Sequence, residues 1–231
     1  MKITEAYELI FKEPHTFTTE EIEFDPSELV DGITLAMHWI AKHKSLPQKE
    51  LLHSPEIKDM HGYTCAMHWI DCVHTFPPKE LLHDPSITDK FKRTCAMHWI
   101  DCVKTPPPQE FYHDPTMKDW CGRTCAMYWI KYVKTLPPKE WMHDPALGRH
   151  TCAMYWIHHV KDEPIPPELL HDPSLQDNKG ETCAMYWIQY RYSLPPKEIL
   201  HDPSLQDKQG KTCATHWAIC MKTEPPPELR F

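Results

Sequence analysis

The chain has 231 residues, of which 41% are apolar, and its 33 acidic and 25 basic side chains give a formal net charge of −8. This composition predicts a folded protein with a sizeable core and excludes a disordered chain. The acidic balance, without any run of Lys or Arg, argues against nucleic acid as a partner. The sequence contains neither a run of 18 apolar residues nor a signal-peptide core, so we expect no membrane partner and a cytoplasmic, reducing location.

A fixed period organises the chain. Seven tryptophans are separated by 30, 30, 30, 27, 31 and 30 residues: Trp39, Trp69, Trp99, Trp129, Trp156, Trp187 and Trp217. A period between about 20 and 50 residues is typical of repeat proteins, whose units stack to complete a shared core. With only six glycines in the sequence, short helices fit this period better than strands. We therefore predict an all-α helical-repeat solenoid of about seven repeats, each a pair of short antiparallel helices.

Because the repeat runs through most of the sequence, we predict one repeat domain over residues 1–231. Residues 1–20 are expected to form an N-terminal capping helix with Thr4 as its N-cap, because a threonine hydroxyl can accept from the free N–H groups of a first turn. Residues 21–223 hold the repeats, and residues 224–231 form a truncated C-terminal cap. We expect these ends to belong to a complete, monomeric small protein.

One repeat shows the expected local structure. Thr94 is a natural N-cap for a first helix over 95–104. A second helix over 78–83 begins at a proline, which suits a first helical turn, and ends at Asp84 because the residue before a proline is pushed out of the α region. The apolar side chains of the first helix fall on one face, at Ala96, Trp99, Ile100 and Val103.

The turns carry a resemblance to a known family. The pattern Asp-x-x-Gly-x-Thr occurs at residues 59–64, 119–124, 177–182 and 207–212, after a segment of the type ELLHDPSL. This pattern resembles the turn and helix start of the ankyrin repeat. The resemblance implies a non-enzymatic scaffold without a cofactor, which binds another protein through its turn tips and the concave face of its helices.

Several features depart from the ankyrin pattern. The unit is about three residues short, methionine stands where that family has a structural histidine, and tryptophan stands where it has a small alanine. Lys92 replaces the turn glycine in one repeat, and residues 146–149 replace a whole turn in another. We expect these two turns to depart from the standard hairpin.

Recurring histidines and cysteines suggest chemistry but favour a structural role. The sequence His-Asp-Pro or His-Ser-Pro recurs at His53, His83, His113, His143, His171 and His201. A catalytic group is needed once, so these copies are expected to satisfy backbone groups, and burial of neutral imidazoles would make the fold weaken on acidification. Cys65, His68 and Cys72 have a spacing compatible with zinc, but a later repeat has tyrosines at the corresponding positions, and no metal site is predicted.

The positions that vary between repeats are the predicted binding residues. Aromatic and basic side chains at the turn tips are types enriched at binding hot spots, although packing between turns or a solvated face would also account for them. The predicted partner-binding residues are Met60, His61, Tyr63, Phe91, Arg93, Trp120 and Arg123 at the turns and Tyr132, His159 and Tyr190 on the helices. By analogy of fold to role, the chain could be a viral or bacterial effector or decoy that occupies a host protein. The alternative is a small-ligand protein that binds a nucleotide or anionic metabolite in an aromatic, basic groove.

Overall fold

The computed structural model describes residues 1–12, 16–143 and 150–230. Its contacts define two compact units, Met1–Asp114 and Pro115–Phe231, and the single domain expected from the sequence remains a prediction. Regular structure in the described ranges is helical apart from one two-stranded hairpin. No helix in these ranges has the length and apolar character needed to cross a membrane.

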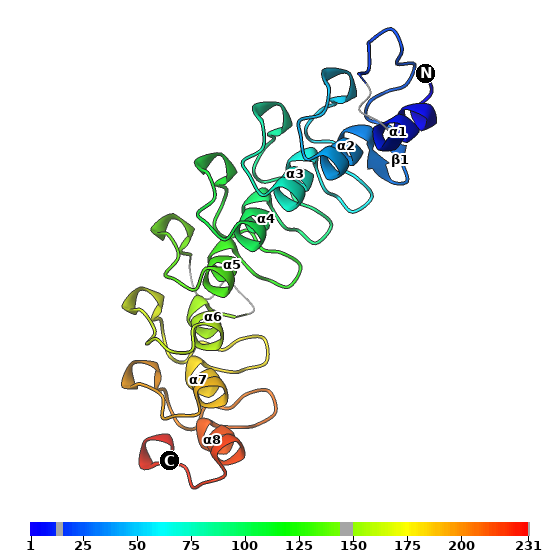
Figure 1. Cartoon of the computed structure of the whole chain (residues 1–231). Coiled ribbons are helices and arrows are strands. Elements are labelled where there is room, and N and C mark those ends of the chain that lie inside the picture. Colours follow the sequence, from blue (N-terminus) through cyan, green and yellow to red (C-terminus); the bar gives the residue numbers. More distant parts are fainter. Residues whose placement is uncertain (13–15, 144–149, 231) are drawn as a thin grey trace. The chain divides into compact units, whose positions relative to one another are not determined.

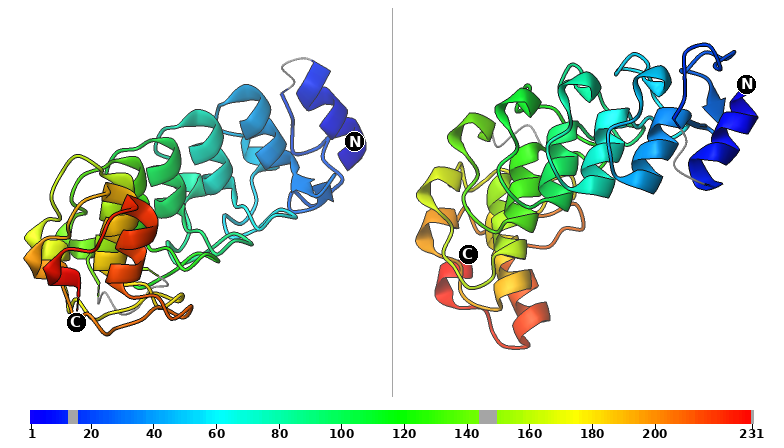
Figure 2. Two further views of the ribbon diagram at one scale, coloured as in Figure 1. Left: turned by 90° about the horizontal axis from the view of Figure 1, so that it is seen from below. Right: turned by 45° about the horizontal axis from the view of Figure 1, so that its top comes forward.

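Unit 1 contains four α-helices and three short 3-10 helices among its described residues. In Figures 1 and 2, α2, α3 and α4 lie side by side, with the 3-10 helices on one side of this row and the turns on the other. The elements are α1 (Ile3–Lys12), β1 (Leu29–Val30), β2 (Ile33–Thr34), α2 (Leu35–His43), η1 (Lys49–Leu51), α3 (Cys65–Val73), η2 (Lys79–Leu81), α4 (Cys95–Cys102) and η3 (Gln109–Phe111).

Unit 2 repeats this arrangement. In its described part, α6 packs against both α5 and α7, and α7 also packs against α8. The elements are α5 (Cys125–Tyr132), η4 (Lys139–Trp141), α6 (Cys152–His159), η6 (Pro167–Leu169), α7 (Cys183–Arg191), η7 (Lys197–Ile199), α8 (Cys213–Met221) and η8 (Pro227–Leu229). Together the two units confirm the predicted all-α helical repeat.

A threonine is the N-cap of each described repeated α-helix, as the sequence predicted, and its hydroxyl accepts a cap hydrogen bond in all of them except α5. The hydroxyl of Thr94 accepts from the N–H of Met97 at 3.4 Å, which satisfies one of the free donors of the first turn. The opening helix is different: α1 begins at Ile3, so Thr4 lies inside it and is not its N-cap. Here the carboxylate of Glu5 accepts from the N–H of Lys2 at 2.9 Å instead.

The second helix of each repeat is shorter than expected. In place of a helix over 78–83, η2 forms a single 3-10 turn at Lys79–Leu81. Pro78 precedes this turn with extended ψ, and the sequence Asp84-Pro85 soon follows it. Pro85 keeps Asp84 out of the α region, and in the short segment that remains the N–H of Leu82 donates to the carbonyl of Lys79 in the 3-10 pattern. The unit is therefore one α-helix and one 3-10 turn.

The turn at Lys92 forms although no glycine is present. Lys92 has a φ of 60°, and its N–H donates to the carbonyl of Asp89 at 3.0 Å, as the N–H of Gly62 donates to Asp59. A lysine adopts this left-handed conformation at a cost of about 1–2 kcal/mol. The expectation that this turn would depart from the others is wrong. The second expected departure, at residues 146–149, lies outside the described residues.

Successive turns within each unit are joined to one another. The N–H of Lys90 donates to the carbonyl of His61 at 3.0 Å, and the N–H of Lys208 donates to that of Lys179 at 2.8 Å. A Cβ added to Gly62 would lie 2.6 Å from the backbone nitrogen of Lys90. Glycine is therefore needed there for a positive φ and for the close approach of the next turn.

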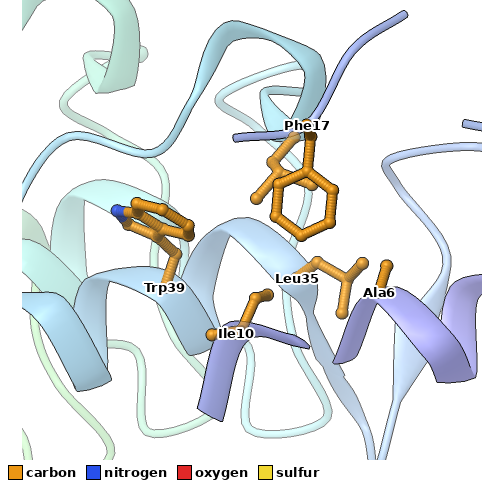
Figure 3. Close-up of a cluster of buried hydrophobic side chains, with 6 residues drawn as sticks. Ala6, Ile10, Phe17, Leu35 and Trp39 are labelled. Atoms are coloured by element: carbon orange, nitrogen blue, oxygen red, sulfur yellow. The ribbon is translucent and has the colours of Figure 1, made fainter. Parts of the chain in front are cut away.

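The core consists of clusters shared by neighbouring helices. Figure 3 shows the first, in which α1 packs on α2 through Ala6, Ile10, Phe17, Leu35 and Trp39. A second cluster joins α2, α3 and η2 through Ala36, Met37, Ile40, Cys65, Trp69 and Leu81. Among the seven repeated tryptophans, Trp39, Trp69, Trp99, Trp129 and Trp156 are buried, whereas Trp187 and Trp217 are half-buried.

Candidate protein-binding surface

Large apolar side chains are exposed at three turn tips. Met60 and Phe91 in unit 1 are 49% and 47% exposed, and Trp120 in unit 2 is 69% exposed. Met60 and Trp120 directly follow a turn aspartate, and Phe91 lies two residues after one. A folded chain usually removes such side chains from water, so the turn tips of unit 1 and, separately, the tip at Trp120 in unit 2 are candidate surfaces for another protein.

Buried aspartates hold the tips in a fixed conformation. The Oδ1 atom of Asp59 accepts from the N–H groups of His61 and Tyr63 at 2.7 and 2.8 Å, and Asp89 does the same for Phe91 and Arg93 at 2.8 Å. These bonds close each turn around its carboxylate. The tip side chains therefore project from ordered backbone.

The other oxygen of each turn aspartate binds the following α-helix. Its partner is a histidine or tyrosine nine residues later, which the sequence analysis did not identify. The distances are 3.0 Å for Asp59–His68, 3.2 Å for Asp89–His98, 2.9 Å for Asp119–Tyr128, 3.2 Å for Asp177–Tyr186 and 3.0 Å for Asp207–His216. The signal in the sequence was the fixed nine-residue spacing. This bond fastens each turn to its helix.

In unit 1 the predicted binding residues Tyr63 and Arg93 belong to an internal network. The Nε of Arg93 donates to Asp89 at 2.9 Å, and its guanidinium also donates to the hydroxyl of Tyr63. The imidazole of His98 lies 3.0 Å from Asp71 and 3.2 Å from Asp89. Burial opposes the charged form of His98, but these two carboxylates outweigh it and raise its pKa.

Arg123 in unit 2 has a similar place. Its Nε donates to Asp119 at 2.7 Å, and its guanidinium donates to the hydroxyl of Tyr128 at 2.9 Å. Burial disfavours the charge of Arg123, but the bond to Asp119 and the neighbouring groups raise its pKa. Both tip arginines therefore brace their own turns, and their role in binding a partner stays a prediction.

Of the three binding residues predicted on the helices, Tyr132 contacts a lysine, whereas His159 and Tyr190 lie in a pocket. The hydroxyl of Tyr132 accepts from the ammonium of Lys131 at 2.9 Å. His159 and Tyr190 line one pocket of unit 2, where the imidazole of His158 lies 4.3 Å from the His159 ring and 4.4 Å from the Tyr190 ring. The structure brings these two predicted residues together in an aromatic pocket.

The histidines of the His-Asp-Pro motif bind backbone and capping groups. The Nδ1 of His83 lies 2.7 Å from the carbonyl of Asp84, so Nδ1 carries the proton and donates. The Nε2 then accepts from the hydroxyl of Thr64 at 2.8 Å, while the same oxygen accepts from the N–H of Met67 at 3.3 Å. The motif thus connects one helix start to the next loop, as the structural interpretation predicted.

Stability should be greatest near pH 6.5 and fall on both sides. Burial lowers the pKa of His53, His83 and His113, so below about pH 6.5 the unfolded chain takes up these protons first and stability falls. Burial of His68 opposes its charge, but Asp59 and Cys72 raise its pKa to about 9. Its contribution is complete below about pH 6.5 and is lost as the pH rises.

Urea unfolding between pH 5 and pH 8 measures this dependence. The variant His68→Gln should show a smaller decline between pH 6.5 and pH 8, with the remainder coming from His98, whose pKa is also raised, and should keep the decline between pH 6.5 and pH 5. A wild-type midpoint that stays constant over the whole range would reject the proposed protonation states.

Among the described residues, the contacts of Cys65 and His68 differ from those of zinc ligands. Burial raises the pKa of Cys65 to about 12, which disfavours the thiolate that zinc requires, and His68 is bonded to Asp59. In the described ranges one group has the proximity needed for a metal, formed by Glu181, Asp207 and His216. Its polar atoms are bonded within the repeat, since His216 binds Asp207 at 3.0 Å and Glu181 accepts from Gln189 at 2.8 Å.

Comparisons with known proteins found similar solved structures but no family model or curated relative. The crystal structure of the ankyrin repeat domain of Bcl-3, described as a unique member of the IkappaB protein family, is 12% identical, with 70% of this chain and 80% of that chain covered and a TM-score of 0.45. The crystal structure of EF0377, an ankyrin repeat protein, is 11% identical, with 82% and 98% covered and a TM-score of 0.33.

In its described residues the chain is an all-α helical-repeat protein. The turn closed by an aspartate and the α-helix capped by a threonine match the pattern that the sequence showed. The 3-10 turn in place of a second α-helix is the main difference.

Proposed function

We propose that the chain is a non-enzymatic scaffold that binds another protein through its turn tips. The observation that supports this most directly is the exposure of Met60, Phe91 and Trp120 on backbone fixed by buried aspartates. Preorganised apolar and aromatic side chains lose little conformational freedom on binding and contribute most of the energy of typical interfaces. The recurring histidines have structural contacts instead of the geometry of a reaction centre.

A finer form of the proposal is that the partner is a host protein and the chain an effector or decoy. Its support is the analogy between free-standing repeat proteins and such roles. Identification of the captured protein by mass spectrometry tests it, and a partner encoded by the same genome as the chain would reject it.

Affinity capture with a tip variant tests the main proposal. Replacing Met60, Phe91 and Trp120 by alanine should reduce capture of a discrete partner at least about tenfold, since hot-spot truncations often cost about 2 kcal/mol or more each. Arg93 and Arg123 stay unchanged, because their substitution would disturb the turn carboxylates. The matched control replaces Leu46, Leu136 and Leu194, which are also exposed but lie in other loops. Equal loss in both variants would contradict the assignment of the tips.

A further inference from the structure

A pocket in unit 2 combines cations with aromatic rings. It has a volume of about 280 Å³ and lies along α5, α6 and α7. Its lining includes Lys131, His158, His159, Lys179, Tyr186 and Tyr190. The ring centroids of Tyr186 and Tyr190 are 5.5 Å apart, and those of His158 and Tyr190 are 4.4 Å apart. Rings thus form a wall beside ammonium groups from a helix and a turn.

Two of the cations that line this pocket, Lys131 and Lys179, form no ion pair within the described part of unit 2, whereas Arg123, which also lines it, is paired with Asp119. Across the described part of the chain, no ion pair joins Lys131, Lys134 or Lys179 to an acidic side chain. The nearby Asp177 is occupied, because its Oδ1 accepts from two backbone N–H groups and its Oδ2 accepts from the hydroxyl of Tyr186. In a chain with a net charge of −8, this is a local excess of cations.

The lowered pKa of His159 agrees with this local excess of positive charge. Burial lowers its pKa to about 4, and the neighbouring His158, Lys131 and Lys134 act in the same direction. The groups that face this imidazole from α5 and α6 are therefore cationic or neutral. An anion placed among them would relieve their mutual repulsion and add charge-assisted hydrogen bonds.

The size of the pocket favours a small anionic group over a whole nucleotide. Sites for drug-sized molecules have volumes of about 300–1,000 Å³, so a pocket of about 280 Å³ is small for a nucleotide or for a similar metabolite. It is sufficient for the end of one side chain. This argues against the nucleotide alternative and in favour of an anionic side chain.

We propose that this pocket binds the carboxylate or phosphate group of a side chain from a partner protein. The ammonium groups of Lys131 and Lys179 neutralise the anion, and the rings of Tyr186 and Tyr190 cover the stem of the partner's side chain. The identity of the occupant as a protein segment rests on the proposed function. The anion site itself does not.

Inorganic phosphate is the first probe. At constant ionic strength, with chloride as the reference salt, phosphate should cause saturable shifts in the NMR signals of the His158 and His159 rings and raise the pKa of His159. The double variant Lys131→Ala and Lys179→Ala should bind phosphate about tenfold more weakly, a difference of about 1.4 kcal/mol. The control replaces Lys139 and Lys197, which are exposed on the 3-10 turns of the same unit.

A second variant guards against misfolding. Lys179→Glu reverses one charge on an exposed side chain and should abolish phosphate binding while the thermal midpoint stays unchanged. Equal binding by wild type and both lysine variants, or shifts that chloride reproduces, would overturn the anion site.

Two peptide pairs then identify the source of the anion. We expect a phosphoserine peptide or a glutamate peptide to bind more tightly than its serine or glutamine counterpart, and the Lys131 and Lys179 double variant should remove that preference. Binding of phosphate without either peptide preference would overturn the assignment to a protein side chain. Loss of partner capture with intact phosphate binding would instead count against the proposed function alone.

Discussion

Replacing Asp89 by alanine is expected to lower the free energy of unfolding by about 3–5 kcal/mol. The carboxylate is 4% exposed and accepts from two turn N–H groups, from Arg93 and from His98. Its removal leaves these donors, one of them a guanidinium, without their partner in a buried site. The pKa of Asp89 is lowered, since the bonds to His98 and Arg93 outweigh burial, so the effect is complete at neutral pH.

Asp84 supplies a matched control for this prediction. It lies five residues earlier and is exposed, and its Oδ1 accepts from the N–H and the hydroxyl of Ser86 at 2.8 and 2.7 Å. Replacing it by alanine should cost much less, because water can replace the bonds of an exposed carboxylate. Urea unfolding at pH 7 compares the two variants. Equal costs would show that the buried carboxylate does not organise the turn.

The second large effect is expected for Trp69. Its indole is 8% exposed, packs with α2 and η2 in one cluster, and donates from Nε1 to the hydroxyl of Thr75 at 3.0 Å. Truncation of a buried tryptophan to alanine costs about 3–5 kcal/mol, because a cavity remains where the ring was. Chemical denaturation of Trp69→Ala measures this loss.

Trp217 is the comparison for Trp69. It occupies the same position in α8 and donates a similar bond to Thr223 at 3.1 Å, but it is half-buried. Its truncation should cost about 1–2 kcal/mol. If both substitutions destabilise the chain equally, packing between neighbouring helices is not the source of the stability of the repeat.

The sequence predicted the elements whose cause is local. Thr94 and most of its equivalents accept a hydrogen bond at a helix start, and the period of the tryptophans follows from the stacking of like units. The length of the second helix was overestimated, because the segment between the prolines forms only one 3-10 turn. The turn at Lys92 was expected to differ because lysine replaces glycine there. Its hydrogen bonds nevertheless hold Lys92 at a positive φ.

The candidate site was predictable only in part. Exposure of Phe91 and Trp120 agreed with their choice as binding residues, but the bonds of Arg93 and Arg123 to turn aspartates did not follow from residue type alone. The pocket of unit 2 brings together side chains from three helices and a turn. Such a grouping depends on the stacking of repeats, which no single repeat reveals.

A comparison of Trp69→Ala with Trp120→Ala tests the central claim most directly. Both remove an indole, but Trp120 is 69% exposed at a turn tip and Trp69 is 8% exposed between helices. Urea unfolding should show a change within about 0.5 kcal/mol for Trp120→Ala and a loss of about 3–5 kcal/mol for Trp69→Ala, while partner capture falls for Trp120→Ala. A Trp120→Ala variant as unstable as Trp69→Ala, or one that captures the partner as well as wild type, would contradict the division between stacking and binding residues.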